Sequence, residues 1–546
     1  MILKNLFILL LIITGIKINS QVQDITWQRC IGSDLEFGSD AYCISKFGSG
    51  YLVGLSVSED GPGITNFHGG GDAWYVHLDS LGNLVWERCY GGSLMDSPYK
   101  IVEADKGNYY LVNISNSEDG DVNCMNNGEA DIWVVKIDLQ GNIIWQECYG
   151  GPDFEYARDA IFTPDGGLLL MGRIFDSGGD ISTFYGEYDV WLCKIDSTGN
   201  IQWENTIGSL GKDNGLRVIL TSGSTYLALC GLNDNGGMTT CEHIGHPSYG
   251  LDIWLVELDL DGNVMRQDCY GGSLDDLGYD IVETSDGFVF TAKTESKDGD
   301  ISGYIGGGSD IWVVKLDKDR KIVWQKCLGG TSYDRPKFLN QTQDNGYVVI
   351  GYTMSNNGYV SGNHWLGNPA NDVWIVKIDS TSEFEWQHCF GGNASDWFLG
   401  HHAVAQKSEY NYVLAPISYS RSTGDIECID YGGFFTTGWI FEIKDCSLLS
   451  PQTPNQPTGP DTLCYTTDST STYSISPAAK AWGYEWKIEP ESAGNLIEDS
   501  LSVYVEWNQQ YEGEVKISAR SYNDCGNSDW SEVKKTWVYN CVGVEE

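Results

Sequence analysis

Hydrophobic residues in this chain occur in short runs, each ended by a cluster of glycine, aspartate or asparagine. One stretch shows the pattern clearly, with runs at 142–149, 159–163, 168–172 and 189–196. Runs of this length that are rich in β-branched and aromatic residues predict four antiparallel strands. The Asp-Gly-Gly and Asp-x-x-Gly-Asn connections predict tight hairpin turns, whereas the connection from 173 to 188 predicts a longer loop.

The four-run pattern repeats along most of the chain, and its most regular mark is an aspartate, a hydrophobic residue and a tryptophan in succession. The tryptophans follow one another at steps of 59, 58, 63, 58, 62 and 65 residues. A four-stranded sheet of this size cannot bury both faces alone, so neighbouring sheets must stack around an axis, which predicts a β-propeller. The tripeptides begin at Asp72, Asp131, Asp189, Asp252, Asp310 and Asp372, and a degenerate one is Thr437-Gly438-Trp439.

A second repeated position predicts how the propeller closes. It also occurs seven times, at Trp27, Trp86, Trp145, Trp203, Arg266, Trp324 and Trp386. The series starts before the first Asp-x-Trp, and no member of it follows Trp439. The N-terminal strand around residues 26–28 is therefore expected to complete the last sheet. The sequence predicts an all-β chain with a seven-bladed β-propeller and N-terminal-strand (Velcro) closure, in which the repeated tryptophans pack between blades.

The strand order divides the loops between two faces. With strands a to d numbered from the axis outward, the tight a–b and c–d turns share one face, and the long b–c and d–a loops share the other. The long loops are variable and acidic, and binding residues in such scaffolds concentrate on variable loops. Their acids include Asp34, Glu59, Asp60, Asp96, Glu118, Asp119, Asp121, Asp153, Asp176, Asp180, Asp213, Asp275, Asp276, Asp298, Asp300, Asp334, Asp396 and Asp425.

Residues 1–20 resemble a secretory signal peptide, with Lys4, an apolar run over 6–16 and a small residue at Ser20. That run is too short to span a bilayer, and no later run reaches the length needed. We therefore expect a secreted or cell-surface protein whose mature propeller covers 21–446. The formal net charge of the whole chain, −43, argues against nucleic-acid and membrane-surface binding. It favours cations or basic partners, although we prefer the interpretation that it serves solubility outside the cell.

Sixteen cysteines in an exported chain suggest disulfides, although the sequence does not settle their pairing. Six of them lie three residues after the second repeated position. Equivalent positions in successive blades lie too far apart to bridge one another. These six are therefore either buried small hydrophobic residues or partners of loop cysteines such as Cys124, Cys241 and Cys428. They are Cys30, Cys89, Cys148, Cys269, Cys327 and Cys389.

The composition changes after the propeller. Residues 447–460 are rich in proline and predict a linker. Short alternating strands over 461–541 then predict an Ig-like β-sandwich, and 542–546 form a tail. Within this region we prefer a Cys464–Cys525 disulfide, with Cys446–Cys541 as a second, outer bridge.

The segments Tyr484-x-Trp486-x-Ile488-x-Pro490, Val505-x-Trp507 and Asn523-x-Cys525-Gly526 resemble the PKD-like modules of exported bacterial proteins. The preceding propeller is similar to the repeat propellers found beside such modules. Together they cover nearly the whole mature chain and resemble cargo of the type IX secretion system. Such cargo normally ends in a sorting domain, and this chain ends about where one would begin. The resemblance implies secretion machinery as a partner if that domain has been lost from the sequence.

Metal and cofactor sites are weakly indicated. The loop Ser296-Lys297-Asp298-Gly299-Asp300 could supply oxygen ligands to Ca²⁺. The alternative, which we favour, is a turn in which aspartates accept backbone N–H groups. Cys241, His243 and His246 form the one compact group of soft ligands and could bind zinc, although their spacing matches no strong signature. No cofactor is otherwise expected.

Three aromatic residues stand outside the repeat and are the candidate ligand-binding residues: Trp365, Trp397 and His401. Charged residues also alternate where the first strands begin, at Lys100, Asp159, Arg217, Asp280, Lys337 and His402, with Cys43 or Asp40 in the first repeat. They predict a ring of ion pairs between neighbouring blades.

The leading hypothesis is a non-enzymatic binding or adhesion scaffold that contacts an extracellular protein or carbohydrate through its acidic loop face. The alternative is a carbohydrate-active enzyme, a glycosidase or lyase, with carboxylates from the same loops. Such an enzyme would place two acids from different blades roughly 5–10 Å apart beside aromatic side chains.

Overall fold

The computed structural model describes residues 24–541, with gaps at 33–38, 62, 106, 241–249, 365–368, 409–410, 421, 428–435, 445–450, 467–468 and 524. Contacts divide the chain into two compact units, one spanning Asp24–Lys444 and the other containing the C-terminal residues from Asp445. The described residues are all-β apart from one short 3-10 helix. None of their helical structure is long or apolar enough to cross a membrane.

Six four-stranded antiparallel sheets follow one another along the described part of the first unit. The first two contain β2 (Asp40–Phe47), β3 (Gly50–Val57), β4 (Asp72–Leu78) and β5 (Leu84–Tyr90), then β6 (Asp96–Glu103), β7 (Tyr109–Ser115), β8 (Asp131–Ile137) and β9 (Ile143–Tyr149). The next two contain β10 (Tyr156–Phe162), β11 (Leu168–Ile174), β12 (Asp189–Ile195) and β13 (Ile201–Ile207), then β14 (Asn214–Leu220), β15 (Tyr226–Leu232), β16 (Asp252–Leu258) and β17 (Val264–Tyr270). The last two contain β18 (Asp276–Thr284), β19 (Gly287–Thr294), β20 (Asp310–Asp317) and β21 (Ile322–Leu328), then β22 (Asp334–Gln341), β23 (Tyr347–Thr353), β24 (Asp372–Ile378) and β25 (Phe384–Phe390).

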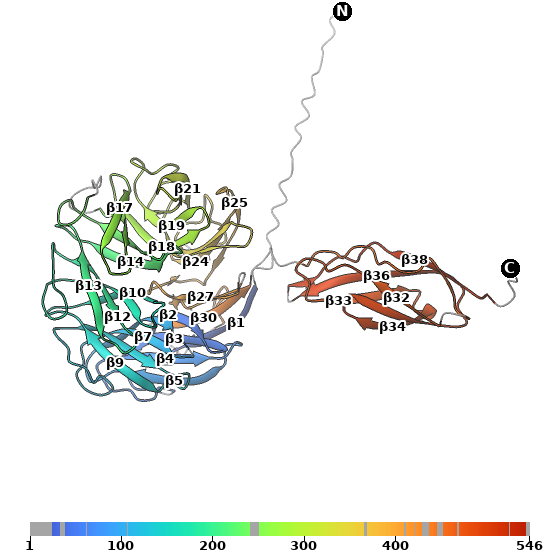
Figure 1. Cartoon of the computed structure of the whole chain (residues 1–546), viewed down its shortest axis with the longest axis horizontal. Helices are drawn as coiled ribbons and strands as arrows, with labels where there is room; N and C mark the ends of the chain where they lie inside the picture. Colours follow the sequence, from blue (N-terminus) through green and yellow to red (C-terminus); the bar gives the residue numbers. More distant parts are fainter. Residues whose placement is uncertain are drawn as a thin grey trace, which may run out of the picture. The chain divides into compact units, whose positions relative to one another are not determined.

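These sheets are arranged as a β-propeller. The first strands of neighbouring sheets contact one another in the order β2, β6, β10, β14, β18 and β22. Figure 1 shows first strands such as β2 and β10 near the middle of this unit, and fourth strands such as β5, β9, β17 and β21 at its outside. The strand order within every sheet is sequential, as the hydrophobic pattern predicts.

A further sheet joins the two ends of the first unit. It contains the short strands β26 (Asp396–Trp397), β27 (Val404–Ser408), β28 (Asn411–Leu414) and β29 (Ile417–Ser418), together with β30 (Thr437–Lys444). The N-terminal strand β1 (Asp24–Ile31) pairs with β30 in antiparallel register, with Asp24 opposite Lys444 and Ile31 opposite Gly438. Both first-unit ends therefore share one sheet, and β27 packs against β2.

The Asp-x-Trp tripeptide begins the third strand of each sheet, and its tryptophan is buried. In every case the indole N–H donates to a glutamate or glutamine side chain on the fourth strand. The pairs are Trp74–Glu87, Trp133–Gln146, Trp191–Glu204, Trp254–Gln267, Trp312–Gln325, Trp374–Gln387 and Trp439–Gln28. In the last pair the partner comes from β1, so the N-terminal strand occupies the place of a fourth strand.

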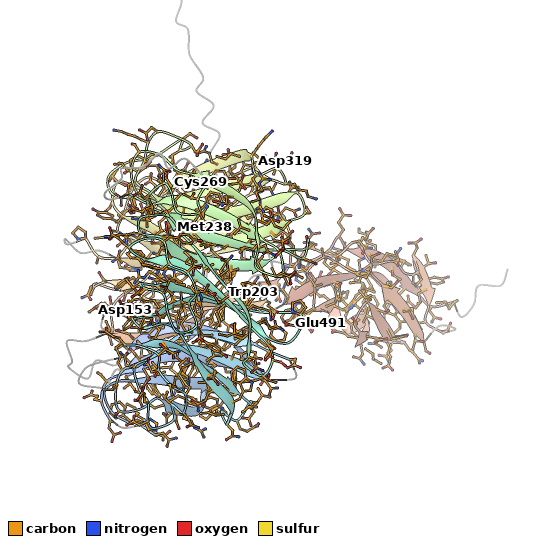
Figure 2. The ribbon with its side chains drawn as sticks, turned by 60° about the vertical axis from the view of Figure 1, so that its left-hand side comes forward. Asp153, Trp203, Met238, Cys269, Asp319 and Glu491 are labelled. Atoms are coloured by element: carbon orange, nitrogen blue, oxygen red, sulfur yellow. A yellow bond between two sulfur atoms is a disulfide. The ribbon has the colours of Figure 1, made fainter. Side chains whose placement is uncertain are left out.

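Three tryptophans of the second series, Trp86, Trp145 and Trp203, donate hydrogen bonds to the next sheet. The indole N–H of Trp145 donates to Ser197 O at 3.1 Å, and that of Trp203 (labelled in Figure 2) donates to Leu260 O at 2.9 Å. Arg266, which replaces tryptophan in one repeat, keeps this function because its guanidinium donates to Asp319 O at 2.6 Å. This departure from the repeat is therefore structural.

The repeated cysteines follow both predicted alternatives. Cys148 forms a disulfide with the loop residue Cys124, with 5.6 Å between their Cα atoms. Cys30 and Cys269 are also disulfide-bonded. Cys89, Cys327 and Cys389 are instead free and buried. The expected partners Cys241 and Cys428 lie outside the described residues.

The second unit is a β-sandwich. One sheet contains β31 (Thr462–Cys464), β33 (Gly483–Glu489), β36 (Gly513–Asn523), β37 (Gly526–Asn527) and β38 (Lys534–Tyr539), and the other contains β32 (Thr470–Ser474), β34 (Gly494–Asp499) and β35 (Ser502–Trp507). The 3-10 helix η1 (Glu491–Ala493) precedes β34. The side chains of Trp486, Val505 and Ile517 belong to the buried core of this unit.

The disulfide prediction for this unit was wrong in its pairing, because Cys464 bonds to Cys541 with 5.8 Å between Cα atoms. β31 runs parallel to β38, which places Cys464 opposite Tyr539, two residues from Cys541. Cys525, which is itself disulfide-bonded, follows the far end of β36. That strand has 11 residues, so its ends lie roughly 33 Å apart.

Part of the expected linker belongs to the sandwich. Thr458 pairs with Ser474, and the carbonyl of Gln452 accepts a hydrogen bond from the hydroxyl of Ser521. Residues 451–460 therefore lie against this unit.

Candidate functional site

Most acids that open the third strands are part of the loop framework. Asp72, Asp131, Asp189, Asp310 and Asp372 are fully buried. One carboxylate oxygen of each accepts a backbone N–H from the preceding loop, as in Asn127 N to Asp131 at 2.9 Å. These acids hold the long b–c loops against the sheet.

A second set of acids holds the d–a loops. Asp276 is representative, because its carboxylate accepts hydrogen bonds from Gly272 N, the Thr294 hydroxyl and the Ser296 hydroxyl. Burial raises the pKa of many acids in the two sets, to about 6 for Asp131 and Asp276, to about 7 for Asp310 and Asp396, and to about 8 for Glu155. In the other sheets, the acids at the position equivalent to Asp276 are Asp96, Glu155, Asp213, Asp334 and Asp396.

The two candidate calcium ligands are engaged by backbone donors. Asp298 accepts from Ser273 N at 2.8 Å, and Asp300 accepts from Gly271 N at 3.1 Å. These donors belong to the d–a loop, so the two carboxylates join two loops rather than cap a single turn. Across the described residues, no group of three or more His, Cys, Asp or Glu side chains is placed to hold a metal ion. Cys241, His243 and His246 lie outside those residues.

The first strand of every four-stranded sheet carries a β-bulge at the same position. The bulged residues are Tyr42, Tyr99, Arg158, Leu216, Tyr279 and Lys337. A bulge re-aims side chains and is frequent beside functional sites. The next residue along each strand forms what we call the axial ring, which also includes His402 because it bridges to Cys43. The ring is Cys43, Lys100, Asp159, Arg217, Asp280, Phe338 and His402.

Four residues of the axial ring are joined by ion pairs. Asp159 pairs with Lys100 and, at 3.8 Å, with Arg217, which pairs with Asp280 at 3.0 Å. Burial alone would raise the pKa of Asp159, but Lys100, Arg217 and His402 outweigh it and lower this pKa to about 2.

The sequence predicts that the ring of ion pairs includes Lys337, but in the structure Lys337 is not part of it. Lys337 lies three residues after Asp334, whereas Lys100 lies four residues after Asp96, so Lys337 is the bulged residue of β22 and the apolar Phe338 occupies the ring position. Lys337 therefore stands beside the ring without a partner there.

The two aspartates of the ring also join neighbouring sheets through hydrogen bonds. Asp159 accepts from Val218 N at 2.7 Å, and Asp280 accepts from Leu339 N at 2.9 Å. Each of these amides belongs to the first strand of the next sheet. Both carboxylates are therefore structural as well as charged.

Two of the three predicted aromatic residues lie around the axis, but the structure does not bring them into contact. Trp397 packs edge-on against Tyr352, with 5.9 Å between ring centroids. His401 lies 5.8 Å from the ring of Tyr279. Trp365 lies outside the described residues.

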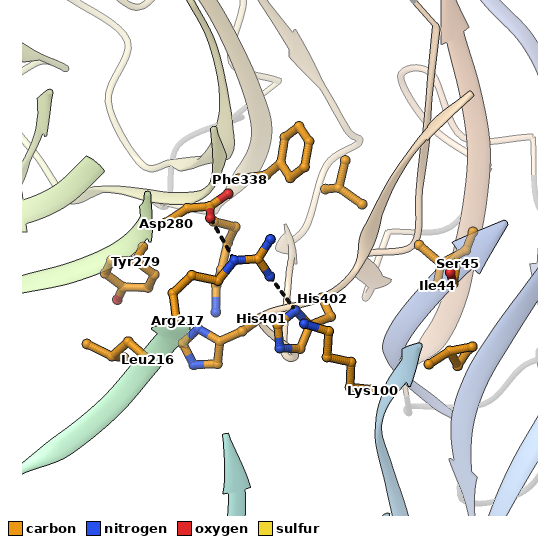
Figure 3. A pocket seen from close by; sticks show the side chains of 13 residues that line it. Ile44, Ser45, Lys100, Leu216, Arg217, Tyr279, Asp280, Phe338, His401 and His402 are labelled. Carbon is orange, nitrogen blue, oxygen red and sulfur yellow. Dashed lines mark hydrogen bonds and ion pairs between the residues drawn. The ribbon is translucent and has the colours of Figure 1, made fainter. Parts of the chain in front are cut away.

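The axial ring forms one side of a pocket of about 170 Å³. Figure 3 shows Lys100, Arg217, Asp280, His401 and His402 around this space. Burial lowers the pKa of both histidines well below the ordinary value, so both are neutral at pH 7. The remaining lining residues include Lys337, Leu216 and Tyr279 from the bulges, and Ile44, Ser45, Ile101, Phe338 and Val404 toward the tight-turn ends of their strands.

Aromatic residues and arginines surround the axis at the loop ends of the first and second strands. Arg173 lies 4.4 Å above the ring of Tyr156 and 4.9 Å from that of Tyr188. Arg335 stands opposite Tyr352 across two strands. We call these residues, with Trp397, the loop-end rim. Within the described residues, neither arginine of the rim forms an ion pair with a carboxylate.

The cations of the axis are what the sequence reasoning missed. Arg158, Arg173 and Arg335 do not interrupt the repeat pattern, and only the bulge brings Arg158 toward the axis. The buried Nε atoms of Arg158 and Arg173 have no hydrogen-bond partner. Burial and the nearby Arg158 lower the pKa of Arg173 to about 10. The three arginines lie at three different positions of the repeat, so no single repeat position marks them.

Comparison with solved structures gives distant likenesses. Puromycin hydrolase matches 83% of this chain and 61% of its own, with 11% identity and a TM-score of 0.44. The β-propeller domain of the trilobed protease from Pyrococcus furiosus matches 69% of this chain and 91% of its own, with 10% identity and a TM-score of 0.34.

Among curated proteins, a regulatory protein named FlaEY from Caulobacter vibrioides is 24% identical over 211 residues, which is 37% of this chain. The match spans 22% of the FlaEY chain. The family comparison concerns the second unit, where residues 450–534 match the model of the PKD-like domain. The C-terminal module is therefore similar to PKD-like domains, as its sequence predicts.

Proposed function

We propose that this chain is an exported, non-enzymatic binding protein whose seven-bladed propeller is closed by β1. The repeated Trp-to-Glu/Gln hydrogen bond supports seven equivalent blades, since it occurs seven times and its last instance joins Trp439 on β30 to Gln28 on β1. The mature protein takes a protein or carbohydrate ligand at the loop-end rim.

Export is supported by the disulfides and by the PKD-like module, both of which are typical of extracellular proteins. With residues 1–20 as the signal peptide, the protein reaches the cell surface or the exterior. The type IX system is the export route that we propose from the resemblance of the whole chain to its cargo.

The observation that carries the binding function is the loop-end rim itself. Tyrosine, tryptophan and arginine are the residues that contribute most to binding interfaces. In the rim they are half-buried around Arg173 and Trp397, whereas many loop acids are engaged by backbone donors. We therefore propose that the rim contacts the ligand and that the ligand is neutral or acidic, rather than the cationic one that net charge alone suggests.

The enzyme alternative receives less support from the ring acids. Asp159 and Asp280 come from different sheets and both approach Arg217, but both carboxylates accept backbone N–H groups. Asp159 is fully buried and, with its pKa of about 2, cannot donate a proton near neutral pH. A glycosidase needs one carboxyl group that stays protonated and reaches substrate. Burial raises the pKa of Asp280, which lines the pocket, but Arg217 and two backbone N–H groups already engage this carboxylate.

A glycan array probed with the full chain, run beside a glycosidase panel, tests this proposal. We expect array binding without hydrolysis. Arg173→Ala and Trp397→Ala should each weaken binding about tenfold or more, while Met265→Ala, at an exposed residue of β17, should leave it unchanged. Hydrolysis that is lost in Asp280→Asn would overturn the proposal in favour of an enzyme.

A further inference from the structure

The axial pocket holds one more cation than its carboxylates balance. Lys100 and Arg217 are matched by Asp159 and Asp280 through the ion pairs of the axial ring. The third cation of the lining, Lys337, forms no ion pair with any described carboxylate. With both histidines neutral, the lining cations outnumber the ring carboxylates by one, and Arg158 and Arg335 add positive charge nearby. That excess lies inside a chain with 76 acidic and 33 basic residues.

Lys337 is buried without the partners that an ammonium group requires. The residue is 8% exposed, and its nearest acceptor is Leu399 O at 3.5 Å. The ring of Tyr279, 5.6 Å away, gives partial compensation. By contrast, the buried residues Lys315 and Lys377 each pair with a carboxylate, on Asp286 and Asp344. An uncompensated buried charge is costly to the folded protein, so Lys337 calls for a negatively charged partner.

A second side chain of the same pocket also lacks a hydrogen-bond partner. The Nδ1 atom of His401 is buried and unpaired, and the residue lines the pocket beside Lys337. A neutral imidazole can donate an N–H from this atom to an anion without adding charge. Figure 3 shows His401 on the same side of Arg217 as Lys100 and His402.

We propose that the axial pocket binds a small organic monocarboxylate, with its carboxylate held by Lys337 Nζ and His401 Nδ1. One negative charge neutralises the ammonium group of Lys337, the lining cation that has no carboxylate partner among the described residues. A cavity of about 170 Å³ admits a ligand of a few heavy atoms. This site is distinct from the loop-end rim, and binding there does not depend on the function proposed for the rim.

The proposal has a characteristic pH dependence. Burial, with Arg335 and Arg158 nearby, lowers the pKa of Lys337 to about 7. The other titratable or charged groups of the lining are Tyr279, Asp280, Arg217, the neutral His401 and His402, and Lys100, whose pKa burial lowers to about 8. Only the protonated lysine attracts an anion, so affinity falls as pH rises through about 7. A carboxylate ligand stays ionised throughout this range.

Acetate is the probe, added to the full chain at constant ionic strength while the melting temperature is followed. At pH 6 we expect a saturable rise in melting temperature. At pH 8.5 the half-saturating acetate concentration should increase by at least about tenfold, because most of the Lys337 population is then neutral. Absence of a saturable rise at pH 6 would overturn the proposal.

Two variants separate binding from folding. Lys337→Met should abolish the acetate effect while leaving the acetate-free melting temperature equal or higher, because an uncompensated charge is removed. His401→Gln should raise the half-saturating concentration about fivefold to tenfold, the worth of one hydrogen bond. The matched control, Lys315→Met, removes a buried lysine that has a carboxylate partner, and should lower the melting temperature but keep the acetate effect.

Two further results would also overturn the proposal. One is a Lys337→Met variant that keeps the saturable response to acetate. The other is tighter binding of inorganic phosphate than of acetate at pH 6, where both are mostly singly charged, since this would show that the pocket prefers a tetrahedral oxyanion to a carboxylate.

Discussion

The loop acids and the axial cations of the propeller differ in how fully partners within the protein engage them, and the more numerous acids are the more fully engaged. The chain has more than twice as many acidic as basic residues, yet many of its loop acids are buried and accept backbone N–H groups. The few cations at the axis, such as Arg158, Arg173 and Lys337, form no ion pair with the described carboxylates. The abundant loop acids therefore serve mainly to hold the structure together. The few axial cations that lack a carboxylate partner remain available to a ligand.

The largest effect on stability should come from reversing the charge of an acid that pairs with the axial cations. Asp159→Lys would place a third cation against Lys100 and Arg217, and would remove the acceptor of Val218 N. We expect a loss of about 3–5 kcal/mol in the free energy of unfolding, measured by denaturant titration. Asp176→Lys, at an exposed loop acid, should change it by less than about 0.5 kcal/mol. Equal effects would remove the distinction between ring and loop acids.

A loop acid that is engaged by the backbone should also be costly to remove. Asp276→Ala leaves Gly272 N and the hydroxyls of Thr294 and Ser296 without their acceptor. We expect about 2–4 kcal/mol of destabilisation, seen in the same titration. Asp261→Ala, at an exposed turn, is the control. If neither variant changed the free energy of unfolding, the loop acids would not be structural and would be free to contact a ligand.

The raised pKa values of the loop acids predict that the propeller is more stable in mild acid. Burial raises the folded-state pKa of Asp310 and Asp396 to about 7 and that of Glu155 to about 8. Their pKa in the unfolded chain is about 4, so between pH 4 and 7 the folded state binds more protons. Stability then falls as pH rises through this window. The melting temperature should be higher at pH 5 than at pH 7.5.

A single substitution checks the source of that pH dependence. Asp396→Asn keeps the shape of the side chain but cannot titrate, so the slope of stability against pH should decrease between pH 5 and 7.5. The slope at lower pH, where Asp159 titrates at about 2, should not change. An unaltered slope between pH 5 and 7.5 would place the effect elsewhere.

The smallest effect should follow removal of divalent cations. Because Asp298 and Asp300 accept backbone N–H groups, excess EDTA should change the melting temperature by no more than about 1 °C. Added Ca²⁺ should likewise have little effect. A rise of several degrees with Ca²⁺ would show that these carboxylates exchange their backbone donors for a metal.

Sequence periodicity predicts the sheets well because it reports burial directly. Every third strand begins at its Asp-x-Trp or at Thr437, and Arg266 fills the place of a tryptophan because a guanidinium can also donate to the next sheet. The C-terminal sandwich follows from alternation in the same way. The Cys464–Cys541 disulfide does not, since it depends on the parallel pairing of β31 with β38.

The axial site is harder to predict because it depends on one inserted residue per strand. Lys337, Arg158 and Tyr279 are all bulged residues at the same repeat position, one residue before the axial ring. A one-residue shift exchanges the two faces of a strand, and Lys337 lies one residue nearer to its repeated aspartate, Asp334, than Lys100 lies to Asp96. Trp397 and His401 were found because they interrupt the repeat, which is a signal that Arg173 lacks.

The pairing of β1 with β30 determines how the first unit responds to tension. Asp24 and Lys444 lie opposite each other in an antiparallel pair, so the chain enters and leaves this unit at the same end of one strand pair. A force applied through these two ends would open the pair like a zipper, one hydrogen bond at a time, rather than shearing all of them together. The unit therefore has a low-force opening point at β1, and stretching a surface-tethered chain is expected to release that strand before any of the four-stranded sheets.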